Sequence, residues 1–474
     1  MKDAQVESDS QSIFERKSIR EMHEEIRDIY LSDQRPWVIG YSGGKDSTTS
    51  LQLIWYALAE LPQEKRKKPV YIISTDTLVE TPIIIDYIVQ TLNRINDAST
   101  KNGLPFKTER LRPMINQSFW VNLLGRGYPA PHQRFRWCTN RLKIEPSNKF
   151  ILDQLSKYGE AVLVLGTRRQ ESSSRAHSMT VYQIHNSALS KHSEFPRAYV
   201  YTPIKDWTTG DVWDYLLQVP SPWGNNNRDL VALYQSAQGE CPLVVDDTTP
   251  SCGNSRFGCW VCTVVEKEKS ITALIDSGQT WLQPLLDIRN FLAQTQDPRL
   301  KPFYREFKRK SGIISFKSDG SGLISRGPYK LEFCRQLLKM VLKAQVDVRN
   351  RGPDPKIQLI MPEELYEIRR IWRTERGDWE DSIPRIHRET TGEDLGWPQD
   401  DISFSSREKS LLQKACQEHD VPIQLVVKLF DAELQTQGMT KRSSIYSKID
   451  KILSEEWRTE EEVMKSQGHP TAPS

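Results

Sequence analysis

A short polar segment, SGGKDS at residues 42–47, holds the residue types that bind a phosphate group. Gly43 and Gly44 allow a sharp turn that brings backbone N–H groups close to an anion. Lys45 supplies a positive charge, and the Ser47 hydroxyl can donate to the same anion. An apolar run precedes the loop and a helix-like pattern follows it, so the helix dipole should also favour negative charge there. The residues predicted to form this binding loop are Ser42, Gly43, Gly44, Lys45, Asp46 and Ser47.

The spacing of this loop differs from that of the common nucleotide-binding loop, GxxxxGK(S/T). Only three residues separate Gly40 from Gly44, and the carboxylate of Asp46 follows the lysine. The glycines alone would also fit a strand-to-helix turn that binds no ligand. The full string SGGKDS makes that alternative much weaker, so we predict a phosphate-binding loop of another kind.

Three arginines follow another strand-like segment, in LGTRRQESSSR at residues 165–175. Arg168, Arg169 and Arg175 carry planar guanidinium groups, which donate two parallel hydrogen bonds to an anionic group. The alternative is that they are solvated arginines in a loop. We predict that they face the anionic part of a ligand.

Two other polar stretches lie near strand or helix ends. In STDT, residues 74–77, Asp76 is a candidate ligand-binding residue, although the stretch could instead cap the next helix. In KDWTTGDVWDYL, Thr208 is placed as an N-cap and Asp211 as its partner three residues later. We expect a structural role for this second stretch.

Four cysteines have the spacing of a metal or iron–sulfur site. Cys259 and Cys262 form a CxxC pair in SCGNSRFGCWVC, which places two thiolates within reach of one metal or cluster. Cys252 and the remote Cys138 could complete four ligands. A zinc site with Cys241 as fourth ligand, or free thiols, are the alternatives.

The elements that must position these residues alternate between strand-like and helix-like patterns. This alternation predicts an α/β fold with a doubly wound, mainly parallel sheet, whose ligands bind beyond the carboxyl ends of the strands. The predicted strands are 37–41, 70–74, 106–111, 161–166 and 198–202. The predicted helices between them are 46–60, 81–97, 146–158 and 208–217.

The whole chain divides by composition and pattern into five expected segments. Residues 1–33 should carry an N-terminal helix at 11–33, and 34–223 the nucleotide-binding domain. Residues 224–310 hold the cysteine cluster, beginning with a stretch at 224–250 rich in Asn, Asp, Gly and Pro that reads as irregular. A linker and a helix should occupy 311–350, and a mostly helical region 351–474.

Composition excludes several classes of protein. Charged residues make up 27% and hydrophobic residues 37%, and no apolar stretch approaches the roughly 18 residues that cross a bilayer. Seven cysteines in 474 residues do not form a disulfide scaffold, so reduced thiols and a cytoplasmic location are expected. The net charge of +3 does not predict nucleic-acid binding. Local basic clusters at 305–310 and 369–376 leave it possible, although solvated helix faces would also explain them.

Taken together, the motifs resemble a known family. SGGKDS is similar to the PP-loop of the ATP pyrophosphatase superfamily. The arginine stretch and KDWTTGDVWDYL are similar to elements of the adenosine phosphosulfate (APS) and phosphoadenosine phosphosulfate (PAPS) reductases. With STDT, WCTNRLKIEP and SCGNSRFGCWVC, the set resembles the PAPS reductase-like DndC family of bacterial DNA phosphorothioation.

The resemblance implies an adenine nucleotide alpha hydrolase-like fold and an ATP pyrophosphatase-type sulfurtransferase that acts on DNA. ATP, with Mg²⁺, would be split to AMP and pyrophosphate to activate a DNA phosphate, and a cysteine desulfurase would supply sulfur. Proteins of the DndD and DndE types would be further partners in the bacterial cytoplasm, with no membrane. The implied catalytic residues are Lys45, Ser47, Arg168 and Arg169, with Asp76 and Arg175 joining the loop in nucleotide binding. The implied ligands of a 4Fe-4S cluster are Cys138, Cys252, Cys259 and Cys262.

The chain departs from the reductases at two points. Trp137 stands where APS reductases have the first cysteine of a pair, and no cysteine follows Cys416, whereas assimilatory reductases carry a nucleophilic cysteine in their tail. APS or PAPS reduction therefore stays an alternative. So do the related SspD proteins of single-stranded phosphorothioation, a tRNA thiolase, and a non-enzymatic metal-stabilised scaffold that binds nucleic acid.

Overall fold

A computed structural model of the chain describes residues 11–171, 173–185, 187–238, 258–318, 321–397, 406–434 and 443–466. The chain folds into two compact units. Unit 1 comprises Met1–Met114 and His132–Leu286, and unit 2 comprises Ile115–Pro131 and Asp287–Ser474. The finer division into five segments stays a prediction. Among the described helices, none combines the length and the apolar character that crossing a bilayer requires.

Unit 1 is built on a six-stranded sheet with the order β3-β2-β1-β4-β6-β5. Neighbouring strands are parallel except β5, which runs antiparallel to β6 at the edge. The predicted α/β fold class and the five predicted strands are confirmed, whereas the three-residue β5 was not predicted. The strands are β1 (Trp37–Gly40), β2 (Val70–Thr75), β3 (Phe106–Leu111), β4 (Ala161–Val164), β5 (Leu189–Lys191) and β6 (Ala198–Tyr201).

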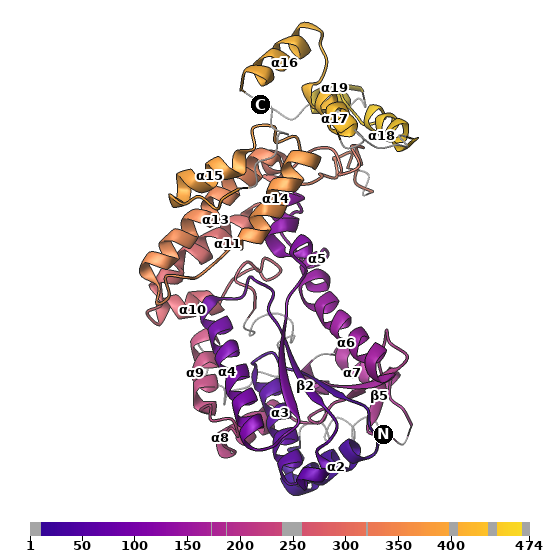
Figure 1. Ribbon diagram of the computed structural model, residues 1–474, viewed down its shortest axis with the longest axis vertical. Helices are drawn as coiled ribbons and strands as arrows, with labels where there is room; N and C mark the ends of the chain where they lie inside the picture. Colours follow the sequence, from indigo (N-terminus) through magenta and orange to yellow (C-terminus); the bar gives the residue numbers. More distant parts are fainter. Residues whose placement is uncertain are drawn as a thin grey trace. The chain divides into compact units, whose positions relative to one another are not determined.

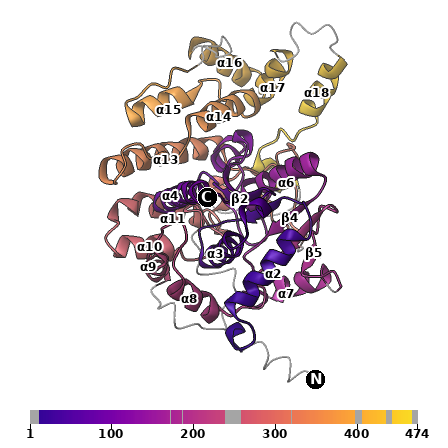
Figure 2. The same ribbon diagram turned by 60° about the horizontal axis from the view of Figure 1, so that its bottom comes forward.

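Helices cover both faces of this sheet (Figure 1). One face packs against α2, α3, α4 and α8 in a large apolar core, and the other packs against α6. Helix α2 lies beside α3 in both views (Figures 1 and 2). The helices of unit 1 are α2 (Ile19–Leu31), α3 (Lys45–Ala59), α4 (Pro82–Lys101), α5 (Trp137–Thr139), α6 (Glu145–Tyr158), α7 (Ser173–Val181), α8 (Thr209–Gln218), α9 (Asn227–Gln238) and α10 (Ser270–Asp276), with short turns η1 (Ile13–Glu15), η2 (Gln63–Lys65), η6 (Arg169–Glu171) and η7 (Thr280–Leu282) and the π-helix η5 (Asn140–Ile144).

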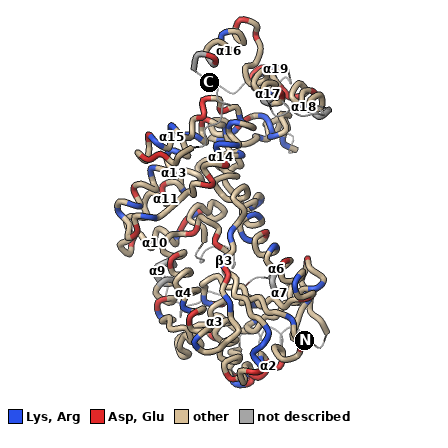
Figure 3. The backbone as a smooth tube through the Cα atoms, in the orientation of Figure 1, with Lys and Arg blue, Asp and Glu red and all other residues tan. Residues whose placement is uncertain are grey.

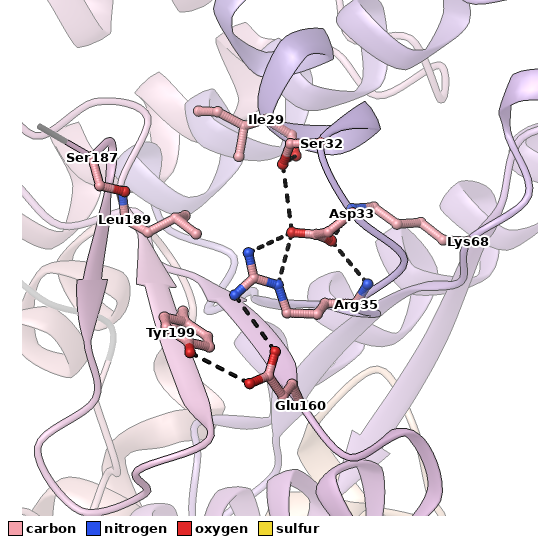
Figure 4. A network of polar contacts seen from close by, with 9 residues as sticks. All are labelled: Ile29, Ser32, Asp33, Arg35, Lys68, Glu160, Ser187, Leu189 and Tyr199. Atoms are coloured by element: carbon pink, nitrogen blue, oxygen red, sulfur yellow. Dashed lines mark hydrogen bonds and ion pairs between the residues drawn. The ribbon is translucent and has the colours of Figure 1, made fainter. Parts of the chain in front are cut away.

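The amino ends of the strands are tied together by a polar network. Asp33 accepts hydrogen bonds from Arg35 Nε at 2.7 Å and from Lys68 Nζ at 3.1 Å (Figure 4). Arg35 also lies 3.9 Å from Glu160, whose carboxylate accepts from the Tyr199 hydroxyl at 3.4 Å. Burial alone would raise the pKa of Asp33, but its two cationic partners outweigh burial and lower it. Because ligands of such sheets bind at the carboxyl ends, this network is structural.

The expectation of irregular structure at 224–250 is wrong for its first half, since α9 covers Asn227–Gln238. The Asn-rich stretch is the start of this helix: the Asn226 side chain accepts from Arg228 N at 3.1 Å. Asn is a strong N-cap residue, because its side chain satisfies a backbone N–H that the first turn leaves unpaired. Leu230, buried in the core of unit 1, anchors the helix.

Residues Ile115–Pro131 leave unit 1 and pack within unit 2. This excursion carries the π-helix η4 (Val121–Gly125). Trp120 Nε1 donates to Leu359 O at 2.7 Å, and Trp372 Nε1 donates to Leu124 O at 2.8 Å. Both indoles are fully buried. The excursion is therefore part of the core of unit 2.

Unit 2 is helical in its described residues, as the sequence predicts for 329–349, 362–376 and 407–465. In the described part of 311–328, the expected loop, only an isolated bridge joins Phe316 to Ile324. The helices are α11 (Gln283–Gln294), α12 (Lys301–Tyr304), α13 (Leu331–Arg351), α14 (Pro362–Glu375), α15 (Ser382–Thr391), α16 (Ser406–Glu418), α17 (Ile423–Leu434), α18 (Ser443–Leu453) and α19 (Glu460–Ser466), with the short turn η3 (Ile115–Gln117).

A buried carboxyl at the start of α14 should make unit 2 sensitive to pH. Glu364 has no exposed surface, and it accepts from Met361 N at 2.9 Å. Burial raises the pKa of Glu364 from 4.5 to about 7, against the hydrogen bonds it accepts. The stabilisation from the protonated form is complete below the unfolded pKa and is lost as pH rises through the folded one. We expect unit 2 to lose on the order of 3 kcal/mol of unfolding free energy between these two pKa values.

Glu364→Gln should remove this pH dependence, because glutamine keeps the accepting oxygen and cannot ionise. The measurement is urea unfolding at pH 5 and pH 8, followed by fluorescence of the buried tryptophans. The variant should gain stability over wild type at pH 8 and differ little at pH 5. Equal differences at the two pH values would contradict the explanation.

Candidate functional site

The SGGKDS segment forms the predicted turn between β1 and the start of α3. Gly43 adopts a φ of 73°, a conformation that glycine reaches without strain. Ser47 Oγ donates to Gly44 O at 3.0 Å and lies 3.1 Å from Ser42 Oγ. Helix α3 begins at Lys45, and its N-cap residue Gly44 provides no side-chain hydrogen bond. The loop thus presents two hydroxyl groups and a helix N-terminus at the carboxyl end of β1, a favourable environment for an anion.

The structure brings Lys45, Asp46 and Arg168 together at this loop. Asp46 lies between the two cations, 2.8 Å from Lys45 Nζ through Oδ2 and 2.7 Å from Arg168 Nε through Oδ1. Burial would raise the pKa of Asp46, but Lys45 and Arg168 outweigh burial and lower it. The carboxylate stays ionised, and the three side chains keep one net positive charge for an anion. This arrangement pairs the predicted PP-loop with the first arginine of the LGTRRQ stretch.

A glycine that the sequence motif contains but does not explain holds this arrangement together. Gly166 follows β4, the neighbour of β1 in the sheet. A Cβ atom at Gly166 would lie 2.6 Å from Asp46 O and 2.9 Å from Ser47 Cα. The two loops touch through their backbones here, at the position where the strand order reverses. Ligands of doubly wound sheets bind at this kind of crevice.

Tyr234 of α9 also lies on the loop, and sequence reasoning missed it. Its hydroxyl accepts from Lys45 N at 3.3 Å, and its ring lies 5.7 Å from Lys45 Nζ. The ring packs edge-on against Trp213 of α8 at 5.2 Å, which fixes its position. The stretch around Tyr234 had been read as irregular, so no sequence signal placed it here.

The structure shows no contact like that of Arg168 with Asp46 for the other two predicted arginines, Arg169 and Arg175, in the part of the chain that it describes. Arg169 Nη1 pairs with Asp206 Oδ1 at 3.3 Å, and Arg169 N donates to Lys205 O at 2.9 Å. These contacts hold the loop after β4 against the segment before α8. Arg175 belongs to α7, and its side chain lies outside the described part of the chain. Its predicted contact with the reacting phosphate stays a prediction.

Asp76 is buried at the end of β2, where its carboxylate organises a turn. It accepts from Leu78 N at 3.0 Å and from Arg112 Nε at 2.9 Å. Leu78 adopts a backbone φ of 66°, which residues other than glycine seldom adopt. The contacts of Asp76 therefore hold a strained turn. A structural role thus accounts for Asp76, and its predicted nucleotide contact stays a prediction.

Three of the four predicted cysteine ligands lie near one another. Cys138 is on α5, and Cys262 N donates to Cys259 O at 3.0 Å in a tight turn. Cys259 Sγ lies 3.3 Å from Thr77 Oγ1, directly after β2. Burial raises the pKa of Cys259 to about 12, and burial together with Cys262 raises that of Cys138. The remaining predicted ligand, Cys252, and the alternative ligand Cys241 lie outside the described residues.

Lys143 and Glu80 complete this cysteine cluster, which we define as Cys138, Cys259, Cys262, Lys143 and Glu80. Cys259, then Glu80 and the other two thiols, raise the pKa of Lys143. Lys143 lies in the π-helix η5, a form often found at functional sites. Lys143 lies in the WCTNRLKIEP motif and Glu80 lies outside the motifs, and no sequence pattern assigns either residue a role.

The donor types of the cysteine cluster suit a metal, since thiolates bind zinc and iron–sulfur clusters. However, among the described residues no three His, Cys, Asp or Glu side chains are arranged to hold a metal ion. Lys143 lies beside the three thiols, and burial outweighs its effect on the pKa of Cys259.

Two family models match the chain. Residues 36–265 match the phosphoadenosine phosphosulfate reductase domain, which covers the sheet, the loop and the cysteine cluster. Residues 407–454, in unit 2, match a small protein found in certain Dnd DNA modification systems. The first match covers slightly less than half of the chain, so it shows a likeness of that segment to a PAPS reductase-like domain.

Individual relatives are more distant. An uncharacterized protein of Methanocaldococcus jannaschii is 28% identical over 242 residues, which cover 51% of this chain and only 39% of that protein. The PAPS reductase of Candida auris is 13% identical, with a TM-score of 0.29, over 45% of this chain and 85% of its own. The tRNA thiolase NcsA of Methanococcus maripaludis, solved with its 4Fe-4S cluster, is 13% identical with a TM-score of 0.28, over 60% of this chain and 80% of its own. Likenesses this low carry no argument about function.

Proposed function

We propose that this chain inserts sulfur into the DNA backbone, using ATP to activate a DNA phosphate. The observation that carries the proposal is the combination, on one chain, of two segments. A PAPS reductase-like domain occupies 36–265, and 407–454 match a small protein of Dnd DNA modification systems. The proposed partners are DNA, a cysteine desulfurase as sulfur donor, and other proteins of the Dnd system.

The loop of unit 1 would bind the β- and γ-phosphates of ATP. Lys45 supplies the charge, Ser42 and Ser47 supply hydroxyl donors, and the α3 N-terminus adds its dipole. Mg²⁺ would accompany these phosphates and neutralise part of their charge. A non-bridging oxygen of the DNA phosphate attacks the α-phosphorus, and pyrophosphate leaves. The DNA phosphate is then joined to AMP, which is a good leaving group.

Sulfur would enter in a second displacement. The terminal sulfur of a persulfide on the desulfurase attacks the activated phosphorus, and AMP leaves with the oxygen that joined it to the DNA. A thiol then cleaves the sulfur–sulfur bond, which leaves a phosphorothioate on DNA and a disulfide between two cysteines. A thiol reductant must then reduce that disulfide, which restores the two cysteine thiols. Cys138, Cys259 and Cys262 are the candidates for this thiol on the present chain.

A 4Fe-4S cluster on Cys138, Cys252, Cys259 and Cys262 is the alternative use of these cysteines, in which case the attacking thiol comes from a partner protein. It would supply a sulfur-rich surface or a structural clamp near the second displacement. Iron and acid-labile sulfide, measured on protein purified without oxygen, test it directly. Both should be present in wild type and absent in Cys259→Ser.

The function is tested in cells that express this protein with its companion proteins. Their DNA is digested and searched by mass spectrometry for nuclease-resistant dinucleotides that contain sulfur. We expect these products with wild type and with Cys416→Ser, whose thiol is buried in α16 of unit 2, but not with Cys262→Ser. Cys416→Ser controls for the loss of a thiol as such.

If no sample contains such dinucleotides, the proposed substrate is wrong. Sulfite formation from APS or PAPS would then be assayed, because the family match covers that reaction as well. If the dinucleotides persist in Cys262→Ser at the wild-type level, the cysteine cluster has no part in sulfur insertion.

A further inference from the structure

Unit 2 contains a groove that neither the nucleotide loop nor the cysteine cluster accounts for. The groove has a volume of 870 Å³, within the range of ligand sites. Its walls are the segment 306–312, the ends of α13 and α14, and the helices α17 and α18. Two contacts hold the last helices against the rest: Arg326 Nη1 donates to Glu460 Oε2 at 2.8 Å, and Glu456 N donates to Gly312 O at 3.1 Å. The groove is thus a built feature of unit 2.

The charge of the groove walls is positive. Ten lysine and arginine side chains line the groove, against five glutamates. Over both units, Lys and Arg alternate with Asp and Glu (Figure 3), and the whole chain has a net charge of only +3. The excess on the groove walls is therefore larger than that of the entire protein. An excess of this sign attracts a polyanion.

The two basic clusters of the sequence, 305–310 and 369–376, make different contacts in unit 2. In 369–376, Arg369 pairs with Asp381 and Arg370 with Glu367, while Arg376 donates to Leu124 O at 3.1 Å. Each of these arginines is engaged within the fold, although Arg376 also lies on the groove wall. In 305–310, by contrast, Lys308, Arg309 and Lys310 line the groove.

Several of the described cations on the groove walls form no ion pair. Within the described part of unit 2, Lys308, Arg309 and Lys451 form no ion pair. Lys308 Nζ lies 4.9 Å from the ring centre of Trp457, and Lys428 Nζ lies 5.4 Å from the same ring. Burial, with Lys428 acting in the same direction, lowers the pKa of Lys308 despite the nearby Glu455. Two lysines therefore face the ring of Trp457, and of these Lys428 is paired with Glu455.

We propose that this groove binds a single strand of DNA. Phosphates would lie against Lys308, Arg309 and Lys451, and the aromatic rings of Trp457 and Phe307 offer faces on which bases can stack. A concave site of this volume suits a flexible strand of a few nucleotides. A rigid duplex instead meets even a single protein module over about 600–1,000 Å². The choice of DNA over RNA rests on the proposed function, whereas binding of a single strand here requires neither ATP nor the cysteines.

The test measures binding of a labelled single-stranded oligonucleotide of about 12 nucleotides to the full chain without ATP. Lys308→Glu/Lys451→Glu should weaken binding at least about tenfold and lower the slope of log affinity against log salt by about 1.4, since two phosphate contacts are lost. Lys339→Glu/Lys343→Glu is the matched control, because these exposed lysines on α13 do not line the groove. It should bind like wild type.

Three outcomes would overturn the proposal. One is that the control variant Lys339→Glu/Lys343→Glu binds the oligonucleotide as weakly as the groove variant, or that the groove variant binds it like wild type. Another is stronger competition by an acidic peptide than by the oligonucleotide, which would make the partner a protein. A third is equal competition by duplex DNA of the same length. If the charge reversal disturbs folding, seen by near-ultraviolet circular dichroism, Lys308→Gln/Lys451→Gln should still weaken binding while the control Lys339→Gln/Lys343→Gln does not. Lys45→Ala should keep full oligonucleotide binding, so failure of sulfur insertion alone would leave the groove proposal standing.

Discussion

Replacement of Lys45 by alanine should abolish the ATP-dependent half-reaction. Lys45 Nζ is the cation nearest the turn of the loop, and it is held there by Asp46 at 2.8 Å. Without it, the leaving pyrophosphate loses a direct positive charge, and Asp46 keeps only Arg168 as a partner. Loss of one preorganised charge at a transition state typically slows a reaction by roughly 10² to 10³-fold. The measurement is exchange of labelled pyrophosphate into ATP, with Mg²⁺, DNA and the companion proteins present.

Lys67→Ala is the control for this substitution. Lys67 is an exposed lysine of unit 1 near the amino end of β2, so the change in charge is the same while the loop is untouched. Wild-type exchange in Lys45→Ala would refute the role given to Lys45 in ATP cleavage. Absence of exchange even with the wild-type protein would refute the enzyme proposal and favour the non-enzymatic nucleic-acid-binding scaffold. Loss of exchange in both variants would point to a general effect of charge.

A second large effect is expected from Gly166→Ala, a change of one methyl group. The new Cβ would lie 2.6 Å from Asp46 O, and real Cβ atoms do not approach backbone that closely. The loop after β4 and the start of α3 must therefore move apart. Overpacking of this kind costs about 1–3 kcal/mol of stability, and a displacement of about 1 Å at a reacting group can cost roughly 10²-fold in rate. Pyrophosphate exchange and the melting temperature should both fall.

Gly210→Ala separates this clash from the general effect of replacing a glycine. Gly210 lies in the first turn of α8, and its added Cβ would meet nothing closer than 3.6 Å. Alanine favours helix over glycine by up to about 1 kcal/mol, so the melting temperature should stay or rise. If Gly166→Ala behaved like Gly210→Ala, the close approach between the two loops would not matter to the site.

The sequence predicts the sheet and the turn after β1 well, because both depend on local patterns. The apolar runs of β1, β2 and β4 are long enough to identify buried strands, and the glycines after β1 fix the turn. The capping box of Thr208 and Asp211 is also confirmed, with Asp211 N donating to Thr208 Oγ1 at 3.0 Å. In each case the interacting residues are close in sequence.

Contacts between distant segments explain what the sequence could not predict. Tyr234 reaches Lys45 across 189 residues, and the composition around it gave a misleading sign of irregular structure. Strand β5 has only three residues, too few for a period to be visible. Lys143 stood inside a quoted motif, but only the fold shows that three thiols surround it. The predicted pairing of Cys138 with the CxxC stretch rested on the family resemblance, and the structure places these thiols near one another.

The excursion of Ile115–Pro131 into unit 2 has a consequence for how the chain is made. Trp120 bonds to Leu359, 239 residues later, so the ribosome must add that length before the partner exists. At about 5–20 residues per second, the excursion waits roughly 12–50 s. During this time its apolar side chains are exposed in a nascent chain whose first strands can already pair. A gene fragment that stops at Leu286 would never supply Leu359, so the apolar side chains of the excursion would stay exposed. We therefore expect chaperone dependence during synthesis, and insoluble product from such a fragment.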